Sequence, residues 1–424
     1  MERGVLFRRI FIPEWDMNFW ITLAIVSLTY LGIALGGFPR LSTNRTTVTL
    51  IGVGLLLLTR QIAFGQIGGF LDLNTLILLF GMMIINANLQ LAGFFRWAGS
   101  FIFRWTRSPR GLLALITILT GILSALFLND TICLMLTPLI LDMTLAAKRN
   151  PIPYLIALAT AANIGSVATL TGNPQNMIIG IASGISYLDF AVALAPIALL
   201  GLGAIWLVLV VMYPTEFRDR QFEPVKQPDL HIDPRLFLKS LLVTGGLLVA
   251  FLLGVPIALA AFIAACTLLI TRRIKPEKIL LGVDTELLVF FGALFIVTGA
   301  METSGLSNRL FDLTRTWLEG GAASLSVVTV ILSNLISNVP AVLLLKPLIA
   351  HFSDPRPAWL TLAAASTLAG NLTLLGSVAN LIVAEVAARR KVKLTFLEYT
   401  KAGLPITLIS LVIGILWLHF FIWK

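Results

Sequence analysis

The stretch LTGNPQNMIIG, from Leu170 to Gly180, decides how this chain must be built. It lies between two apolar runs, YLIALATAANIGSVAT before it and MIIGIASGI overlapping its end. Pro174 has no backbone N–H and Gly172 has no side chain, so neither supports a continuous helix. Asn173 and Asn176 add side-chain amides that need hydrogen-bond partners. Such a stretch inside an apolar run predicts a helix that is interrupted within a membrane.

The composition places the whole chain in a membrane. Of the 424 residues, 58% are hydrophobic and only 12% are charged, whereas soluble proteins carry about 25% charged residues. Apolar runs of about 20 residues, the length of a membrane-spanning helix, recur along the chain. Because these runs are continuous rather than alternating, they exclude a transmembrane barrel. We therefore predict an all-α polytopic membrane protein.

The charged and metal-binding residues exclude several other functions. The net charge of +10 is expected from basic residues beside membrane spans, which set topology and contact anionic lipids. It does not indicate nucleic-acid binding. The cysteines, Cys133 and Cys266, lie in apolar runs, and the histidines are scattered at His231, His351 and His419. This pattern gives neither a disulfide framework nor a metal-ligand set, so we expect no metal and no cofactor.

The predicted architecture has ten transmembrane helices in an inverted repeat, with two re-entrant hairpins and two interrupted helices. The spans are expected near 19–37, 44–60, 73–92, 152–185, 190–213, 237–254, 256–272, 285–304, 358–388 and 402–422. The hairpins are expected at 111–147 and 322–351, and the interrupted spans are 152–185 and 358–388. A polar stretch at 214–236 is predicted to be a cytoplasmic linker between a first repeat, 1–213, and a second, 237–424.

The hairpins of the two halves match in sequence. SALFLNDTICLMLTPLI, which begins at Ser124, aligns with SNLISNVPAVLLLKPLI, which begins at Ser333. The arms are separated by NDT at 129–131 and by SNVP at 337–340, so Asn129 pairs with Asn338. Because five spans is an odd number, the second half would enter the membrane in the opposite direction. That inverted repeat is a common plan among secondary transporters.

The interrupted spans also match, in two competing alignments. NIGSVATLTGNPQNMII resembles NLTLLGSVANLIV. This pairs Asn163 with Asn371, and Asn176 with Asn380 if the second loop is shorter. The competing alignment places GSVA at 165–168 on GSVA at 376–379. Both alignments give each half one polar hairpin and one interrupted span.

Basic residues predict the orientation. With the N-terminus outside, cytoplasmic segments hold 22 of the 31 lysines and arginines, as the positive-inside rule requires. Arg3, Arg8 and Arg9 lie on the outer side and oppose this arrangement. We expect a multi-pass protein of the cell (inner) membrane with both termini outside.

The hairpin tips and interruptions are the predicted substrate site, because irregular backbone at membrane depth is tolerated only where protein buries it or water reaches it. The candidate substrate-binding residues are amides, hydroxyls and glycines: Asn129, Thr131, Thr171, Gly172, Asn173, Asn176, Asn338, Asn371, Thr373, Gly376, Ser377 and Asn380. No arginine lies in these motifs, which favours a small neutral or weakly charged polar solute. Alternatively, such amides and hydroxyls only join helices, and the glycines only permit turns.

Two carboxylates are candidates for proton coupling. Asp130 lies at the tip of an apolar hairpin, where a charged residue is costly and usually functional. The alternative is that Asp130 caps the second arm of the hairpin. Glu302 ends a span and is the second candidate.

These motifs resemble the ion transporter superfamily. NDTICLMLTPLI followed by TGNPQNMIIG, with SNVP and LLGSVAN in the second half, is most similar to the arsenite permease branch, which includes arsenite/antimonite efflux pumps and plant silicic-acid exporters. The resemblance covers essentially the whole chain. It implies an inverted-repeat fold, alternating access, and a substrate site lined by the NDT, GNPQN, SNVP and GSVAN segments.

The hairpin tips depart from one branch of the superfamily. Its sodium-coupled carboxylate carriers are known for a Ser-Asn-Thr triplet at each tip. Here the tips read Leu128-Asn129-Asp130 and Ser337-Asn338-Val339. The loss of hydroxyls weakens the case for sodium coupling, and the lack of arginine argues against a dicarboxylate substrate.

The sequence therefore predicts a proton-coupled antiporter that exports arsenite and antimonite. The alternatives are a sodium/proton antiporter, with Asp130 exchanging the cations, and an exporter of silicic or boric acid. An enzyme is not expected, because no nucleophile–base pair and no HExxH spacing appears. The expected partners are the metalloid substrate, protons and the lipid bilayer, with a soluble ATPase subunit as a further candidate.

Overall fold

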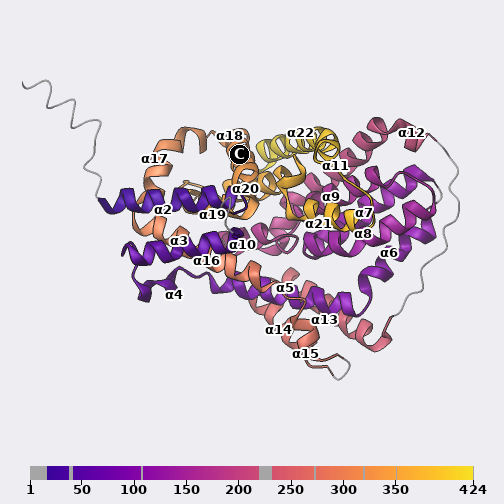
Figure 1. Cartoon of the computed structure of the whole chain (residues 1–424), viewed down its shortest axis with the longest axis horizontal. Helices are drawn as coiled ribbons and strands as arrows, with labels where there is room; N and C mark the ends of the chain where they lie inside the picture. The colour runs from indigo at the N-terminus through magenta and orange to yellow at the C-terminus, as the bar shows by residue number, and fades with distance from the viewer. Residues whose placement is uncertain are drawn as a thin grey trace, which may run out of the picture. The chain divides into compact units, whose positions relative to one another are not determined.

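The computed structural model describes residues 17–37, 42–106, 108–218, 232–271, 274–318, 320–349 and 351–423 (Figure 1). Within these ranges the regular structure is helical. Most of the predicted linker at 214–236 lies outside the described residues. The same holds for Arg3, Arg8, Arg9 and His231, named above, and for four arginines counted among the cytoplasmic basic residues: Arg40, Arg107, Arg272 and Arg273.

The chain forms two compact units, and each unit draws on both halves of the sequence. The first unit comprises residues 1–72, 286–316 and 343–351, and the second comprises residues 73–285, 317–342 and 352–424. The helices of the first unit are α2 (Met17–Ala34), α3 (Arg45–Leu58), η1 (Phe64–Gln66), α4 (Ile67–Phe70), nearly all of α16 (Thr285–Thr303), most of α17 (Leu306–Leu318) and the end of α19 (Asn338–Ile349).

The first-half helices of the second unit include one hairpin and one interrupted span. Its first-half helices are α5 (Leu73–Leu91), α6 (Phe94–Trp105), α7 (Pro109–Leu126), α8 (Asn129–Ala146), α9 (Pro151–Ser166), α10 (Pro174–Ser183), α11 (Tyr187–Met212) and α12 (Pro214–Phe217). The predicted hairpin at 111–147 is α7 and α8. The predicted interrupted span at 152–185 is α9, a loop and α10.

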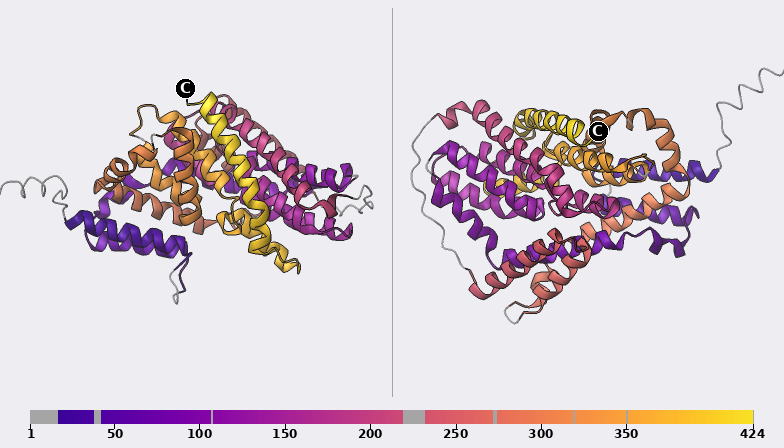
Figure 2. Two further views of the ribbon diagram at one scale, coloured as in Figure 1. Left: turned by 90° about the horizontal axis from the view of Figure 1, so that it is seen from above. Right: turned by 180° about the vertical axis from the view of Figure 1, so that it is seen from behind.

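The same unit continues with helices from the second half of the sequence. They are α13 (Pro234–Leu252), α14 (Ile257–Leu269), α15 (Pro276–Leu280), α18 (Gly321–Ile336), the start of α19, α20 (Pro355–Ala369), η2 (Leu374–Gly376), α21 (Val378–Arg389) and α22 (Phe396–Phe421). Helix α7 packs on α9, α18 packs on α20, and the long helices α11 and α22 run alongside each other (Figure 2).

Eight of the described helices are long and apolar enough to cross a membrane: α2, α5, α7, α8, α11, α13, α16 and α22. Two predicted spans are shorter, since α3 has 14 residues and α14 has 13. The count of ten spans therefore stays a prediction.

Helices α6 and α17 are absent from the sequence-based prediction. Each follows a long helix and precedes a hairpin arm. Helix α6 buries Phe95, Ala98 and Ile102 and exposes Arg96 and Arg104. Such amphipathic helices are not apolar enough to be found as membrane spans.

Candidate functional site

Both interrupted spans restart at a capped helix. The side-chain Oδ1 of Asn173 accepts from the backbone N–H of Asn176 at 2.9 Å, which begins α10. Pro174 is the first residue of that helix, where no backbone donor is needed. In the second half, Ser377 Oγ accepts from the backbone N–H of Ala379 at 3.3 Å, which begins α21. The proline and the polar residues therefore start a new helix inside the span.

One asparagine in each half makes the same pair of hydrogen bonds. Asn176 Nδ2 donates to the backbone carbonyls ten and seven residues before it, at 3.0 and 2.9 Å. Asn380 Nδ2 donates to the carbonyls ten and seven residues before it, at 2.7 and 3.1 Å. Each amide thereby ties the end of one helix to the start of the next. These bonds give Asn176 and Asn380 the same local role.

The other expected pairings of the interrupted spans are wrong. Asn163 lies inside α9, whereas Asn371 follows the end of α20. The GSVA at 165–168 lies at the end of α9, whereas the GSVA at 376–379 begins α21. Both alignments were based on identical residues. Residues share a role, however, when they lie at the same place relative to a helix end.

Asn163 is the centre of the site. It accepts from Asn129 Nδ2 at 3.0 Å and from Ser377 Oγ at 3.0 Å. Its own Nδ2 donates to Asn371 Oδ1 at 2.9 Å and to Asn380 Oδ1 at 3.1 Å. We call these five residues the amide cluster. All of them are buried, and they join α8, α9 and α21 (Figure 1).

The two interrupted spans contact each other reciprocally. Thr367 lies as far before Asn380 as Asn163 lies before Asn176. The cap residue of α21, Ser377, donates to Asn163, while the cap residue of α10, Asn173, donates to Thr367 Oγ1 at 3.3 Å. Each half therefore places its helix cap against the interrupted helix of the other half.

The backbone fixes the orientation of the cluster's amides. A carbonyl can only accept a hydrogen bond, so the Nδ2 of Asn380 must face its two carbonyls and its Oδ1 must face Asn163. Asn163 must then present Nδ2 to Asn380 and Oδ1 to Asn129. Asn129 in turn donates through its Nδ2 to Asn163, so its Oδ1 has no partner in this chain of hydrogen bonds. A flipped assignment of Asn129 would break this chain of bonds.

Several buried amide oxygens lack a hydrogen-bond partner among the described residues. They belong to Asn86, Asn88, Asn129, Asn176, Asn334 and Asn338. The amide of Asn334 is fixed in the same way as that of Asn176, because its Nδ2 donates to two backbone carbonyls at 3.0 and 3.2 Å. A buried acceptor without a partner is costly, so these oxygens are suited to a ligand that donates hydrogen bonds.

The predicted glycines allow close approach of backbone segments. A Cβ on Gly172 would lie 2.6 Å from Ser166 Cα and 2.8 Å from the Ser124 carbonyl oxygen. This closeness lets the Asn129 backbone N–H donate to the Gly172 carbonyl at 3.0 Å, which holds the hairpin tip on the loop. A Cβ on Gly376 would lie 2.9 Å from the Gly370 carbonyl oxygen. Neither Gly172 nor Gly376 is among the residues with positive φ.

The remaining predicted site residues lie around the cluster. Thr131 Oγ1 accepts from Asn86 Nδ2 at 3.4 Å, and Thr171 Oγ1 lies 3.4 Å from the hydroxyl of Tyr187. Thr373 takes part through its carbonyl, which accepts from Asn380. Asn338 begins α19, directly after Ser337, whose φ of 79° lies in the strained left-handed region.

The two candidate proton carriers have different surroundings. Asp130 is the second residue of α8, directly after Asn129, and Leu128 occupies the cap position. The alternative that Asp130 caps this helix is therefore wrong. Among the described residues its carboxylate has no hydrogen bond or ion pair. Glu302 is exposed in the last turn of α16, in the first unit.

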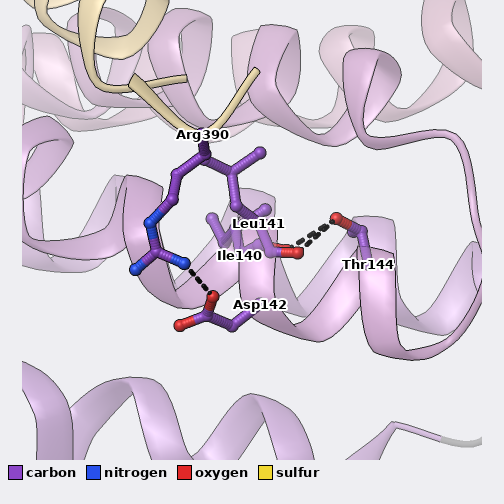
Figure 3. A network of polar contacts seen from close by, with 5 residues as sticks. All are labelled: Ile140, Leu141, Asp142, Thr144 and Arg390. Carbon is purple, nitrogen blue, oxygen red and sulfur yellow. Dashed lines mark hydrogen bonds and ion pairs between the residues drawn. The ribbon is translucent and has the colours of Figure 1, made fainter. Parts of the chain in front are cut away.

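Two ion pairs involve charged residues of the hairpin arms. Asp142 of α8 accepts from Arg390 at 2.6 Å, beside the end of α21 (Figure 3). Both side chains are exposed, so this pair contributes little stability. Within the first unit, Lys346 of α19 lies 3.9 Å from Asp72. Among the residues that the structure describes, no lysine or arginine makes one of the hydrogen bonds of the amide cluster.

Sequence reasoning left out several residues of this site. Asn163, Ser166 and Thr367 are hydrogen-bonded to it, and Asn334 donates to the Ala369 carbonyl at the end of α20. Asn163 stood inside a matched stretch and could have been chosen for that reason. The other three carry no signal of their own, since serine, threonine and asparagine occur throughout membrane helices.

Comparisons with known proteins agree with this architecture. The family model described as citrate transporter (CitMHS) matches residues 30–365. The silicon efflux transporter LSI3 of Oryza sativa subsp. japonica is 34% identical, over 89% of this chain and 93% of that protein. The putative transporter arsB of Dictyostelium discoideum is 24% identical, over 88% and 87%.

A solved structure has a similar fold. The crystal structure of the Alcanivorax borkumensis YdaH transporter matches with a TM-score of 0.62 at 16% identity, covering 96% of this chain and 98% of that one. Together with the apolar helices, these likenesses identify a multi-pass membrane transporter and confirm the predicted superfamily.

Proposed function

This chain belongs to the citrate transporter family, and we propose that it exports arsenite and antimonite as neutral hydroxides in exchange for protons. Transport would proceed by alternating access, with the two halves of the chain acting as inverted repeats around the amide cluster. The antiporter would lie in the cell (inner) membrane, with both termini outside.

The observation that carries this proposal is the set of unpartnered amide oxygens. Those of Asn129, Asn176 and Asn334 have orientations fixed by backbone carbonyls, so rotation of the amide cannot remove the unpaired acceptor. A ligand that suits them must donate hydrogen bonds or carry positive charge. Arsenite in neutral water is the uncharged trihydroxide, whose hydroxyl groups donate.

A citrate-like substrate suits this site poorly. A carboxylate only accepts hydrogen bonds, so it cannot satisfy unpartnered amide oxygens, and it is usually bound by arginine or lysine side chains. The cluster's hydrogen bonds involve neutral amides and a hydroxyl. The family's name therefore refers to a different chemistry from the one that these residues favour.

Proton coupling rests on Asp130. Its carboxylate adjoins Asn129, which contributes one of the unpartnered oxygens. A carboxylate in an apolar segment is suited to bind and release a proton. A neutral solute feels no membrane potential, so accumulation against a gradient needs a coupled ion. We assign that role to the proton carried by Asp130.

Silicic acid is the second candidate substrate. It is also a neutral hydroxide, and the rice relative at 34% identity is named a silicon efflux transporter. Sodium would suit the same oxygens as a bare cation, which gives the sodium/proton antiporter as a third reading.

Uptake into everted membrane vesicles separates these substrates. With an imposed proton gradient, acid inside, we expect arsenite to accumulate, with no saturable stimulation by sodium at fixed pH. Silicate and citrate are measured in parallel, with vesicles that lack the protein as the control. Accumulation of citrate, or of sodium without arsenite, would contradict the proposal, and accumulation of silicate alone would favour the second candidate.

A further inference from the structure

A cavity lies beside the interrupted span of the first half. Its volume is about 380 Å³, and it lies between the turn from α10 to α11 and the turn from α13 to α14. The wall includes Asn74 of α5, Ser186 and Tyr187 on one side, and Phe251 and Pro256 on the other. Because a water molecule takes about 30 Å³ of liquid, the cavity has room for a small hydrated solute.

Two stacked aromatic rings form part of this wall. The rings of Tyr187 and Phe251 have centroids 5.1 Å apart and an interplanar angle of 26°. Both side chains are nearly inaccessible, at 6% and 1% exposure. They come from different helices, so the stack joins α11 to α13.

The hydroxyl of Tyr187 reaches the predicted site. It lies 3.4 Å from Thr171 Oγ1, at the outer limit of a hydrogen bond. Thr171 is fully buried and directly precedes Gly172, whose carbonyl accepts from the backbone of Asn129. The ring of Tyr187 thus has the cavity on one side and the loop that holds the hairpin tip on the other.

The turns beside both rings contain a glycine in the left-handed region. Gly184 has a φ of 65° and precedes Tyr187 by three residues, and Gly254 has a φ of 79° and follows Phe251 by three residues. A residue in this left-handed region is normally glycine. Among the contacts of the Tyr187 hydroxyl, the one to Thr171 is long, so it restrains the ring weakly.

We propose that Tyr187, stacked on Phe251, is a gate between the amide cluster and this cavity, which serves as the vestibule for a small hydroxylated solute. When the Tyr187 ring leaves Phe251, solute passes between Thr171 and the cavity. When the ring returns, the stack separates the two. The proposal rests on the transport function proposed above, but its test does not need a transported substrate.

The test measures how fast a thiol reagent reaches position 171. The parent protein carries Thr171→Cys in a background of Cys133→Ser and Cys266→Ser, reconstituted in liposomes, and a membrane-impermeant methanethiosulfonate is the probe. We expect Tyr187→Ala to raise the labelling rate about tenfold. A decrease of about 1.4 kcal/mol in the free energy of the open state relative to the closed state is enough for this change. Phe251→Leu removes the stack but keeps an apolar side chain, and it should also raise the labelling rate.

The matched control is Leu188→Ala, since Leu188 is adjacent to Tyr187 and exposed and does not line the cavity. Its labelling rate stays at the parent value. Size-exclusion profiles show whether each variant is folded. The gate proposal would be overturned if Tyr187→Ala and Phe251→Leu both label within about twofold of the parent rate. The stack would then only pack the two helices together. Because labelling needs no arsenite, failure of the substrate proposal would appear separately, in the uptake assay.

Discussion

Removing the Asn163 side chain should damage the fold more than any other single change in the site. Asn163→Ala deletes four hydrogen bonds, two accepted and two donated. It leaves three amide groups without that partner: Nδ2 of Asn129 and the Oδ1 atoms of Asn371 and Asn380. Each buried polar group that loses its partner costs about 1–3 kcal/mol, so the expected loss of stability is about 3 kcal/mol or more.

A matched change at Thr367 tests this reasoning. Thr367 accepts from Asn173 and from Gln175 at 3.3 Å each, and Asn173 keeps a second bond to Ser166 at 2.8 Å. Thr367→Val keeps the shape of the side chain and should cost only about 1 kcal/mol. Both proteins are purified in detergent, and their unfolding is followed by heating or by titration with a denaturing detergent.

We expect Asn163→Ala to unfold well before the wild type and Thr367→Val to unfold close to it. Transport by Asn163→Ala should fall even at temperatures where it stays folded, because Asn129 loses the bond that fixes its amide. Equal midpoints for the two variants, or wild-type uptake by Asn163→Ala, would refute the view that Asn163 organises the site.

Three further changes address proton coupling, thiol chemistry and packing. Asp130→Asn keeps the side-chain volume but cannot carry a proton, so arsenite exchange across vesicles should survive while proton-driven accumulation fails; accumulation at the wild-type rate would remove Asp130 from the mechanism. Cys133→Ser and Cys266→Ser should each keep most transport, since one thiol is buried, the other is exposed and no second thiol is near in sequence; loss of resistance in a folded Cys133→Ser protein would implicate thiol coordination. Gly172→Ala forces a Cβ to within 2.6 Å of backbone atoms and should cost about 1–3 kcal/mol, measured as a lower unfolding midpoint. Gly203→Ala, inside α11 with no neighbour within 4 Å, should leave the midpoint unchanged or raise it slightly, because alanine favours a helix over glycine.

The apolar helices of this protein and the breaks within them were readable from its sequence, whereas the amphipathic helices α6 and α17 were not. In an apolar solvent every backbone group needs a partner within the same segment, so long apolar runs must be helices. Any break must then be marked by residues that end or cap a helix. Asn173 and Pro174 mark such a break in LTGNPQNMIIG, and α10 begins there. The same logic located the hairpin tips at Asn129 and Asn338, where α8 and α19 begin.

The pairing of the side chains was decided only by the tertiary structure. Asn163 contacts Asn371 and Asn380, more than 200 positions away, and no local pattern encodes that contact. Sequence similarity even suggested that Asn163 and Asn371 were equivalent, although one lies inside α9 and the other follows the end of α20. Which amide oxygen is left unpaired depends on every other bond in the chain of amides, beginning at two backbone carbonyls. A sequence can supply the amides, but only the packing of α8, α9 and α21 determines which way each one faces, and therefore what the site can bind.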